Sequence, residues 1–300
     1  MTNTLPANWP PGVPVFEEIR VENTNHCSYE CFFCPRDKLT RDRGFMSLGD
    51  LEKVLAQFPD FSGQVDLHGF GEPLLDKDLV QKIGLVKRTW PKCRTRIYST
   101  LGVRLQGHQR SALVTSGLNT IEVSFYGIDR ESYRLTHGVD RFDIAFANLT
   151  ALCTLNKTAG SPLQVIIRDF PLHDDVKRPG MENKKLDDFR AYLSQIGVSE
   201  IHDRQLHNYG GGRSYNAAPA DGVCSIAWGY RKRVLQVAWN LDIIPCCFDF
   251  NATVVIGSLR HHSISEIYQL ETYKNFIDAH QTNDLSKYAV CVGCERCFKE

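Results

Sequence analysis

Short apolar segments with strand character alternate with helical segments along residues 15–212, and this alternation constrains the fold more than any other feature. The strand-like segments are 15–21, 65–67, 96–99, 120–125, 163–167 and 199–206. The helical segments are 48–58, 77–89, 106–116, 143–155 and 184–196. Strands that alternate with helices of about ten to fifteen residues are typical of βαβ units and a parallel sheet. Six units are too few for an eight-fold barrel, so we expect an α/β fold with an open or partial barrel.

The two ends of the chain lack this alternation. Residues 1–14 carry four prolines and are expected to form an extended N-terminal arm. Residues 213–300 contain six of the eleven cysteines, so we expect a separate small module that a metal centre holds together. The predicted domains are therefore the arm at 1–14, the barrel at 15–212 and the C-terminal module at 213–300.

The composition excludes several classes of protein. The chain has 35 Lys+Arg and 35 Asp+Glu residues and is 42% hydrophobic, so we expect neither a mainly disordered chain nor a nucleic-acid binder driven by bulk charge. The N-terminus lacks the features of a secretory signal, and no segment has the roughly 18 apolar residues of a membrane span. We therefore expect a cytoplasmic protein with neither nucleic acid nor a membrane as partner. Because thiols stay reduced in the cytoplasm, clustered cysteines indicate metal ligands.

Three cysteines follow the first strand-like segment at short spacing. Cys27, Cys31 and Cys34 stand in the order C-x3-C-x2-C. Three thiolates on a short loop can bind three irons of a cubane cluster and leave the fourth iron without a protein ligand. An open coordination site is what a catalytic metal centre needs, whereas a structural site closes all four positions. The alternative is a zinc site that takes a distant fourth ligand such as His26.

The segment CSYECFFCP, which contains these cysteines, resembles the cluster-binding motif of radical S-adenosylmethionine (radical SAM) enzymes. Residues 69–73, GFGEP, are similar to the GGEP motif of the same family, with Phe70 in place of a glycine. Because the motifs follow successive strands, the chain is identified as a member of this family. The resemblance implies a partial (β/α)6, TIM-like barrel that binds S-adenosylmethionine (SAM) and a [4Fe-4S] cluster held by Cys27, Cys31 and Cys34.

The resemblance also assigns SAM-binding residues. The aromatic residue before the third cysteine is expected to lie against the adenine, the GFGEP backbone to bind the methionyl amino group, and a polar residue at the end of the fourth strand to meet the ribose. These positions are Phe33, Gly69, Gly71, Glu72, Pro73 and Ser124. For Ser124, a plain strand serine is the alternative. Ser99 and Thr100 end the third strand, where other members of the family have a related polar turn.

The cysteines of the C-terminal module resemble the SPASM or twitch extension of radical SAM enzymes, which holds auxiliary iron–sulfur clusters. In that pattern a hairpin contains a G-x4-C segment; here Leu241 stands at the glycine position, so we expect a different turn. Six cysteines are fewer than the roughly seven of a domain with two clusters, which favours one auxiliary [4Fe-4S] cluster. Its expected ligands are Cys224, Cys246, Cys291 and Cys294, with Cys297 competing for a place and Cys247 left over. A zinc knuckle and a ferredoxin-like site are the alternatives.

Polar residues at the carboxyl ends of the predicted strands are candidates for substrate contact. His68 precedes GFGEP, Arg168 ends the fifth strand, and His207 follows the sixth. In parallel α/β folds such positions line the ligand pocket, although many of them only satisfy loops. Cys93 and Cys153 are expected to be packing residues.

The resemblance implies an enzyme that reductively cleaves SAM to a 5′-deoxyadenosyl radical and abstracts a hydrogen atom from a small polar substrate. An auxiliary cluster that accepts an electron would make the net reaction an oxidation (dehydrogenation), as in the twitch-type 2-deoxy-scyllo-inosamine dehydrogenase. Crosslinking or epimerisation of a ribosomal peptide is the enzymatic alternative. A non-catalytic protein that binds an iron–sulfur cluster or zinc, or carries electrons, is the non-enzymatic one. A flavodoxin or ferredoxin is the expected reductant.

Overall fold

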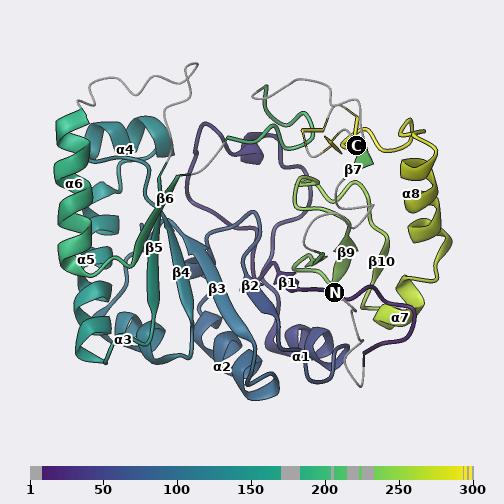
Figure 1. Ribbon diagram of the computed structural model, residues 1–300, viewed down its shortest axis with the longest axis horizontal. Coiled ribbons are helices and arrows are strands. Elements are labelled where there is room, and N and C mark those ends of the chain that lie inside the picture. Colours follow the sequence, from purple (N-terminus) through teal and green to yellow (C-terminus); the bar gives the residue numbers. More distant parts are fainter. Residues whose placement is uncertain are drawn as a thin grey trace.

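A nine-stranded sheet forms the centre of the molecule, with the strand order β10-β9-β8-β1-β2-β3-β4-β5-β6 (Figure 1). The structure is a computed structural model that describes residues 9–169, 183–203, 206–214, 223–224, 233–292, 294–295 and 297–298. Parts of the predicted arm (1–8), of the predicted sixth strand (204–205) and of the C-terminal module (215–222 and 225–232) lie outside the described residues.

Six parallel strands confirm the predicted α/β fold with a partial barrel. Each strand pairs in parallel with the next one along the chain and overlaps the segment predicted for it. The six are β1 (Glu18–Val21), β2 (Gln64–Leu67), β3 (Arg94–Ser99), β4 (Thr120–Ser124), β5 (Gln164–Asp169) and β6 (Glu200–Asp203). The carboxyl ends of all six strands therefore meet at one edge of the sheet, which is where ligands bind in such folds.

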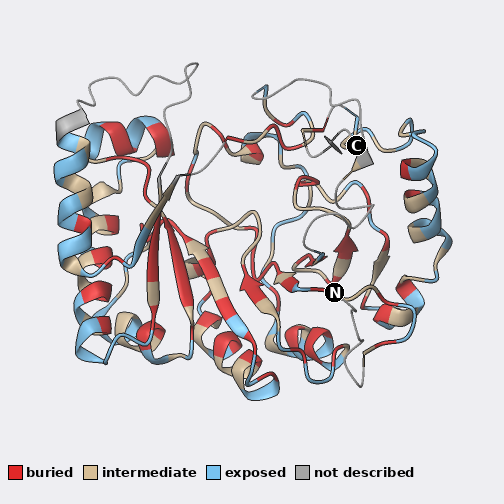
Figure 2. Cartoon of the chain, in the orientation of Figure 1, coloured by how far each residue is buried: buried red, intermediate tan, exposed pale blue. Residues whose placement is uncertain are grey.

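Helices cover the outer face of these strands (Figure 1). They are α1 (Leu48–Ala56), α2 (Leu79–Thr89), α3 (Gly107–Thr115), α4 (Arg130–His137), α5 (Phe142–Thr158) and α6 (Asn183–Ile196). Apolar strand residues such as Ile19, Val65 and Ile121 are completely buried in the core, and the buried residues follow the strands and the inner helix faces in Figure 2. None of the helices within the described ranges is both long and apolar enough to cross a membrane.

Helix α4 is an element that the sequence pattern does not predict. Its eight residues, RESYRLTH, are mostly polar, so they lack the apolar stripe by which a helix is identified. The ends are nevertheless well defined: Asp129 and Ser132 form a reciprocal capping box, and Gly138 ends the helix with a φ of 71°. Capping and tertiary contacts therefore stabilise a helix that no apolar stripe reveals.

The sheet continues into the C-terminal part of the chain. Strand β8 (Val234–Val237) pairs in parallel with β1, and β9 (Asp242–Ile244) and β10 (Gly257–Ser258) follow it in antiparallel order. The predicted C-terminal module therefore shares a sheet with the barrel: β8 covers the edge of β1, whose backbone groups would otherwise lack strand partners. Helices α7 (Ile264–Ile267) and α8 (Glu271–Gln281) follow, and β7 (Val223–Cys224) pairs with β11 (Cys297–Phe298). The domain boundary at 212/213 stays a prediction.

Leu241 occupies the turn between β8 and β9. Its φ is 71°, a left-handed conformation that favours glycine and costs other residues about 1–2 kcal/mol. The leucine side chain is completely buried, which stabilises the fold by about 1.5–3 kcal/mol and offsets that cost. Leucine at the glycine position of the family pattern is therefore compatible with a backbone conformation that glycine favours.

Candidate active site

A cavity of about 470 Å³ lies at the carboxyl ends of the strands, within the size range of small-molecule sites. It brings together most of the site residues expected from the sequence. Those that line it are Cys27, Cys31, Phe33, Cys34, His68, Gly69, Gly71, Glu72, Ser124, Arg168 and His207. Pro73 is buried at the start of a short 3-10 helix, η2 (Pro73–Leu75), behind the cavity wall. The roles assigned to these residues stay predictions.

The cysteine loop and the GFGEP loop are bound to each other. The guanidinium of Arg36, which follows the third cysteine, donates to the carbonyl oxygens of Asn25 (2.8 Å) and Phe70. The Glu72 amide donates to the carbonyl oxygen of His26 (2.8 Å). A Cβ atom at Gly71 would lie 2.4 Å from the carbonyl oxygen of Thr24, so only glycine allows this approach. The two motifs therefore form one rigid wall of the cavity.

The Glu72 side chain forms hydrogen bonds with other residues of the protein. It is completely enclosed and accepts hydrogen bonds from Ser99 Oγ (2.7 Å), from the Thr100 amide (2.8 Å) and from Thr100 Oγ1 (2.7 Å). Burial raises the pKa of this carboxyl group, and the hydrogen bonds oppose the rise. These contacts fix the GFGEP loop to the end of β3. Ser99 and Thr100, the polar turn noted at the end of the third strand, hold the loop in place and also line the cavity.

The surroundings of Cys27 act on its charge in opposite directions. Burial raises the pKa of the Cys27 thiol to about 11, the Glu72 carboxylate adds to the rise, and the Arg36 guanidinium opposes it. Metal binding therefore has to displace a proton from this thiol. Arg36 has only backbone carbonyl oxygens as hydrogen-bond acceptors among the described contacts, so its charge is available to balance an iron–sulfur cluster. Within the described residues, no three His, Cys, Asp or Glu side chains are grouped around a single metal position.

Aromatic side chains from the cysteine loop and the GFGEP loop also line the cavity. Phe33 is buried and packs edge-on against Tyr126, with 5.1 Å between the ring centroids. Phe70, the departure from the family motif, has its ring centroid 6.0 Å from those of both Tyr209 and Phe250. The Phe70 ring therefore contacts Tyr209, near the end of the predicted barrel, and Phe250, in the C-terminal part of the chain. Glycine, which has no side chain, could not make these contacts.

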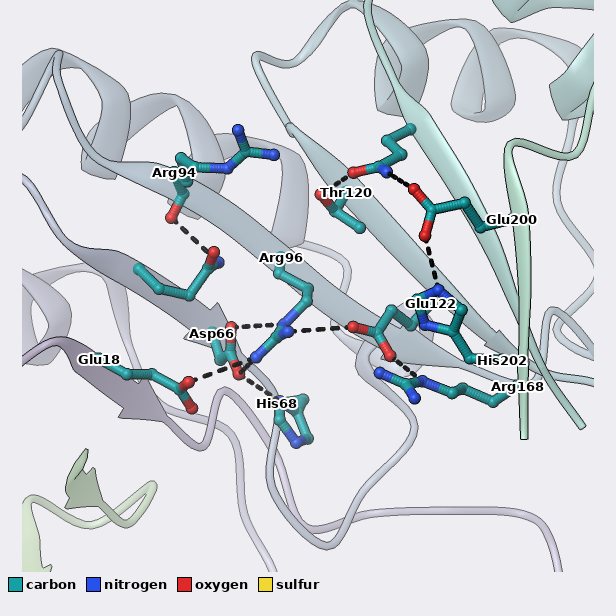
Figure 3. Close-up of polar contacts among 12 residues, drawn as sticks. Glu18, Asp66, His68, Arg94, Arg96, Thr120, Glu122, Arg168, Glu200 and His202 are labelled. Carbon is teal, nitrogen blue, oxygen red and sulfur yellow. Dashed lines mark hydrogen bonds and ion pairs between the residues drawn. The ribbon is translucent and has the colours of Figure 1, made fainter. Parts of the chain in front are cut away.

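A ladder of alternating charges crosses the inner face of the sheet below the cavity, and Figure 3 shows five of its six members. The members of this charge ladder are Arg20 and Glu18 on β1, Asp66 on β2, Arg96 on β3, Glu122 on β4 and Arg168 on β5. Arg96 is central: it donates to Asp66 through Nε (2.9 Å) and Nη2 (2.7 Å), and to Glu122 through Nη1 (3.0 Å). The three carboxylates are buried, and burial raises the pKa of Asp66 to about 6.

The charge ladder is missing from the sequence predictions, although a signal was present. In β3, Arg94 and Arg96 alternate with the buried Thr95 and Ile97, and in β4 Glu122 stands between the apolar Ile121 and Val123. One strand face packs on the helices, so the charged residues must point to the inside of the barrel. Charges at alternate positions of several parallel strands therefore indicate a polar interior.

The three candidates for substrate contact all reach the cavity, each with a protein partner. His68 Nδ1 lies 4.0 Å from Asp66 Oδ2, and its ring centroid is 4.3 Å from that of Tyr98. Arg168 donates from Nε to Glu122. His207 Nδ1 contacts the carboxylate of Glu295, which follows Cys294 directly in the chain. His207 therefore connects the cavity to the C-terminal cysteine segment.

The C-terminal cysteines form a second site. Cys224, Cys246, Cys291 and Cys294 line one small apolar cavity, together with Phe248, Phe276 and His280. The cavity is about 30 Å³, so these side chains would have to turn outward to admit a four-iron cluster, although the set of four thiols suits one. The Cys297 side chain lies outside the described residues, but its Cα is paired with that of Cys224 across β7 and β11.

Two neighbouring cysteines point to different cavities. Cys246 lines the small cavity, whereas Cys247 lines the large one. A hydrogen bond with Cys247 and burial raise the pKa of Cys246 well above its ordinary value. Cys247, which has no predicted role, lies in the wall of the candidate active site. One peptide bond thus separates the two cysteine sites.

The chain matches one family model and is similar to several known proteins. Residues 224–297 match the family model of the SPASM iron–sulfur cluster-binding domain. Two similar proteins are the probable GTP 3′,8-cyclases of Methanothermobacter thermautotrophicus, 29% identical over 164 residues, and of Saccharolobus islandicus, 30% identical over 198 residues. These matches cover 54% and 66% of this chain, but only 52% and 59% of the two relatives.

Solved structures with the same fold cover nearly the whole chain. BtrN in complex with AdoMet and 2-DOIA aligns with a TM-score of 0.61 at 21% identity and covers 94% of both chains. Native anSMEcpe with bound AdoMet aligns with a TM-score of 0.56 at 14% identity, over 93% of this chain and 90% of that one. Streptococcus suis SuiB bound to the precursor peptide SuiA aligns with a TM-score of 0.56 at 14% identity, over 87% and 66%.

The SPASM match, the similar cyclases and the similar structures together support a radical SAM enzyme with a SPASM auxiliary-cluster domain. They agree with the family predicted from the two motifs. The comparisons also support the predicted cofactors, because the matched domain is described as cluster-binding and two of the similar structures contain AdoMet. At identities of 14% and 21%, the similar structures show only that this chain shares their fold.

Proposed function

We propose that this protein is a radical SAM enzyme that abstracts a hydrogen atom from a small polar substrate and oxidises it. The observation that carries the proposal is the cavity of about 470 Å³, in which the three-cysteine loop, the GFGEP loop and the charged inner face of the barrel meet. An electron carrier needs the cysteines but neither of the other two features. Their combination therefore favours an enzyme.

The residues present fit the proposed cofactors. Cys27, Cys31 and Cys34 would hold a [4Fe-4S] cluster with one open iron, and Phe33 would lie against the adenine of SAM. The glycines of the GFGEP loop leave carbonyl oxygens for the methionyl amino group, and Ser124 lies within reach of the same cavity. When bound, the cluster and SAM would supply a 5′-deoxyadenosyl radical, and the auxiliary cluster would accept the electron that the substrate loses. The protein's own task is to orient these groups and to exclude water.

The inner wall of the cavity favours a small polar substrate. Besides Arg20 and Arg168, the lining includes His68, Tyr98 and Gln236, whose donors and acceptors suit hydroxyl, amino or acidic groups. The carboxylates of the charge ladder lie behind the guanidinium groups and keep them in place. An apolar substrate would displace water from these polar groups without offering hydrogen bonds in return.

The position of the second site supports a net oxidation. Cys246 and Cys247 join the auxiliary cavity to the active-site cavity, and Phe248 lines both. An electron that leaves the substrate would therefore have a short path to an auxiliary cluster. In such a reaction the substrate loses two hydrogens: one as an atom to the radical, the other as a proton with the electron passing to the cluster.

The similar proteins suggest which substrates to test. The curated relatives are named as acting on GTP, BtrN was solved with 2-DOIA, and SuiB was solved with a precursor peptide. Two of these three molecules are small and polar, as is the wall of the cavity. The chain matches only about half of the length of the curated relatives. GTP is therefore no more than one candidate substrate to test.

The test uses protein purified and reconstituted without oxygen. About eight irons per chain with equal sulfide would support two four-iron clusters. Dithionite and SAM should then yield 5′-deoxyadenosine and methionine, measured by liquid chromatography and mass spectrometry. A true substrate should stimulate this yield and give a product lighter by two hydrogens. Iron-loaded protein that binds SAM without cleaving it would contradict the proposal, and a peptide product would favour the alternative reaction.

A further inference from the structure

The C-terminal turn of α4 holds the cysteine loop. The carbonyl oxygens of Thr136 and His137 accept hydrogen bonds from the amides of Phe32 (3.3 Å) and Glu30 (3.1 Å). The last carbonyl groups of a helix have no partner within the helix, so they are free to bind another segment. At Gly138 a Cβ atom would lie 2.5 Å from the Glu30 carbonyl oxygen, which requires glycine at this contact. A helix absent from the sequence prediction thus positions the loop that carries all three cysteines.

The side chain of His137 extends this contact to a cysteine sulfur. Its Nδ1 lies 3.3 Å from Cys31 Sγ, and its side chain is completely buried. The ring is held between aromatic side chains, with centroid distances of 4.1 Å to Tyr133 and 5.2 Å to Tyr126, the latter stacked. This packing leaves the imidazole no freedom to turn away from the sulfur.

The protonation of the His137 ring follows from its second contact. The Tyr126 amide donates a hydrogen bond to Nε2 at 3.4 Å. Because Nε2 is an acceptor, it carries no hydrogen, and the ring cannot be the doubly protonated cation. The single ring hydrogen must therefore lie on Nδ1, which makes Nδ1 the donor and Cys31 Sγ the acceptor. The backbone of Tyr126 thus fixes the tautomer that the sulfur contact needs.

We propose that His137 is a positioning residue of the radical SAM site, through an N–H···S bond to the cluster ligand Cys31. The inference rests on the proposed function, because it takes Cys31 as a ligand. A donor on a thiolate sulfur withdraws negative charge and stabilises the reduced, more negative form of a cluster. His137 should therefore raise the reduction potential of the catalytic cluster and favour its reduction before SAM cleavage.

The first test needs no variant. Wild-type protein is labelled with ¹⁵N-histidine, reconstituted, reduced and studied by pulsed EPR in ordinary and deuterated water. The inference predicts hyperfine coupling of the catalytic cluster to one histidine nitrogen and to one exchangeable proton. Addition of SAM changes the spectrum of this cluster alone and so separates it from the auxiliary cluster. The absence of both couplings would overturn the inference.

The second test compares variants. His137→Phe keeps a ring of similar size but removes the donor, and it should lower the midpoint potential of the catalytic cluster in an EPR-monitored titration without loss of iron. His137→Asn keeps an N–H group near the position of Nδ1 and should recover part of the shift. Tyr133→Phe is the matched control: it changes the same aromatic cluster without touching the donor and should leave the potential unchanged.

The outcomes separate this inference from the proposed function. Equal potentials in wild type and His137→Phe, with SAM cleavage intact, would overturn the role of His137 and leave the function standing. If His137→Phe does not fold, the His137→Asn potential and the couplings in wild-type protein decide the question. If wild-type protein forms no cluster on Cys27, Cys31 and Cys34, both proposals fail together.

Discussion

The two cysteine sites of this molecule differ in almost every physical property. The candidate active site has three cysteines on one eight-residue loop, at the edge of a cavity of about 470 Å³ with a charged wall. The candidate auxiliary site has four cysteines from three separate segments, around an apolar cavity of about 30 Å³. An enzyme needs an open metal position at the first kind of site, whereas the second kind closes around its metal. The comparison teaches that the spacing of cysteines indicates a metal site, and the surroundings indicate its role.

The largest expected effect separates the two sites directly. Replacing Cys27, Cys31 and Cys34 together with Ala should reduce 5′-deoxyadenosine formation to background, because no thiolate remains for the catalytic cluster. The variant should keep about half of its iron, in the auxiliary site. A variant with Cys93→Ala and Cys153→Ala, two cysteines buried in the hydrophobic core, serves as the control and should keep all of its iron. Undiminished SAM cleavage in the triple variant would exclude these cysteines as ligands.

The converse variant tests the auxiliary site. Cys294→Ala removes one of the four thiols around the small cavity and should also lose about half of the iron. SAM binding, measured by calorimetry, should remain, because the large cavity does not include this residue. Turnover of substrate should fall, since no second cluster is left to accept an electron. Full iron content in this variant would show that Cys294 is not a ligand.

The wall of the large cavity contains buried ion pairs, so removing one charged partner should destabilise the protein. Arg96→Met would remove the shared partner of the buried Asp66 and Glu122 and leave each carboxylate with one arginine, so the free energy of unfolding should fall by about 2–3 kcal/mol. Denaturant titration of the apo-protein measures this change. Arg130→Met provides the control, because Arg130 and its partner Asp143 are both mostly exposed and should contribute less than about 1 kcal/mol. Equal losses in both variants would mean that the charge ladder behaves like a surface ion pair.

The smallest expected effect concerns a residue between the two regions. Phe70→Gly restores the family residue and removes a half-buried ring from its contacts with Tyr209 and Phe250, so stability should fall by about 1–2 kcal/mol. SAM affinity should stay within a few-fold of wild type, because the backbone path of the GFGEP loop is fixed by Gly71 and Glu72. Thermal unfolding and calorimetry measure the two effects. A large loss of SAM binding would instead assign the Phe70 ring to the cofactor site.

Local patterns were enough to predict much of the fold. The six strands and five of the six helices between them, all but α4, depend on residues within one or two turns of each other. The same holds for the C-x3-C-x2-C and GFGEP motifs, whose spacing is fixed within nine or fewer residues. These features can be predicted from the sequence because they depend on hydrogen bonds and hydrophobic periodicity between residues that are close in the chain.

Only the tertiary structure decided how these parts meet. Cys31 and His137 are 106 residues apart, and the helix that brings His137 to the loop has no apolar stripe to reveal it. The charge ladder depends on the register of five strands, and the pairing of β8 with β1 joins the C-terminal part to the barrel. Cys246 and Cys247 are neighbours in the chain, but they line different cavities. Contacts of this kind depend on packing between distant segments, which residue spacing does not encode.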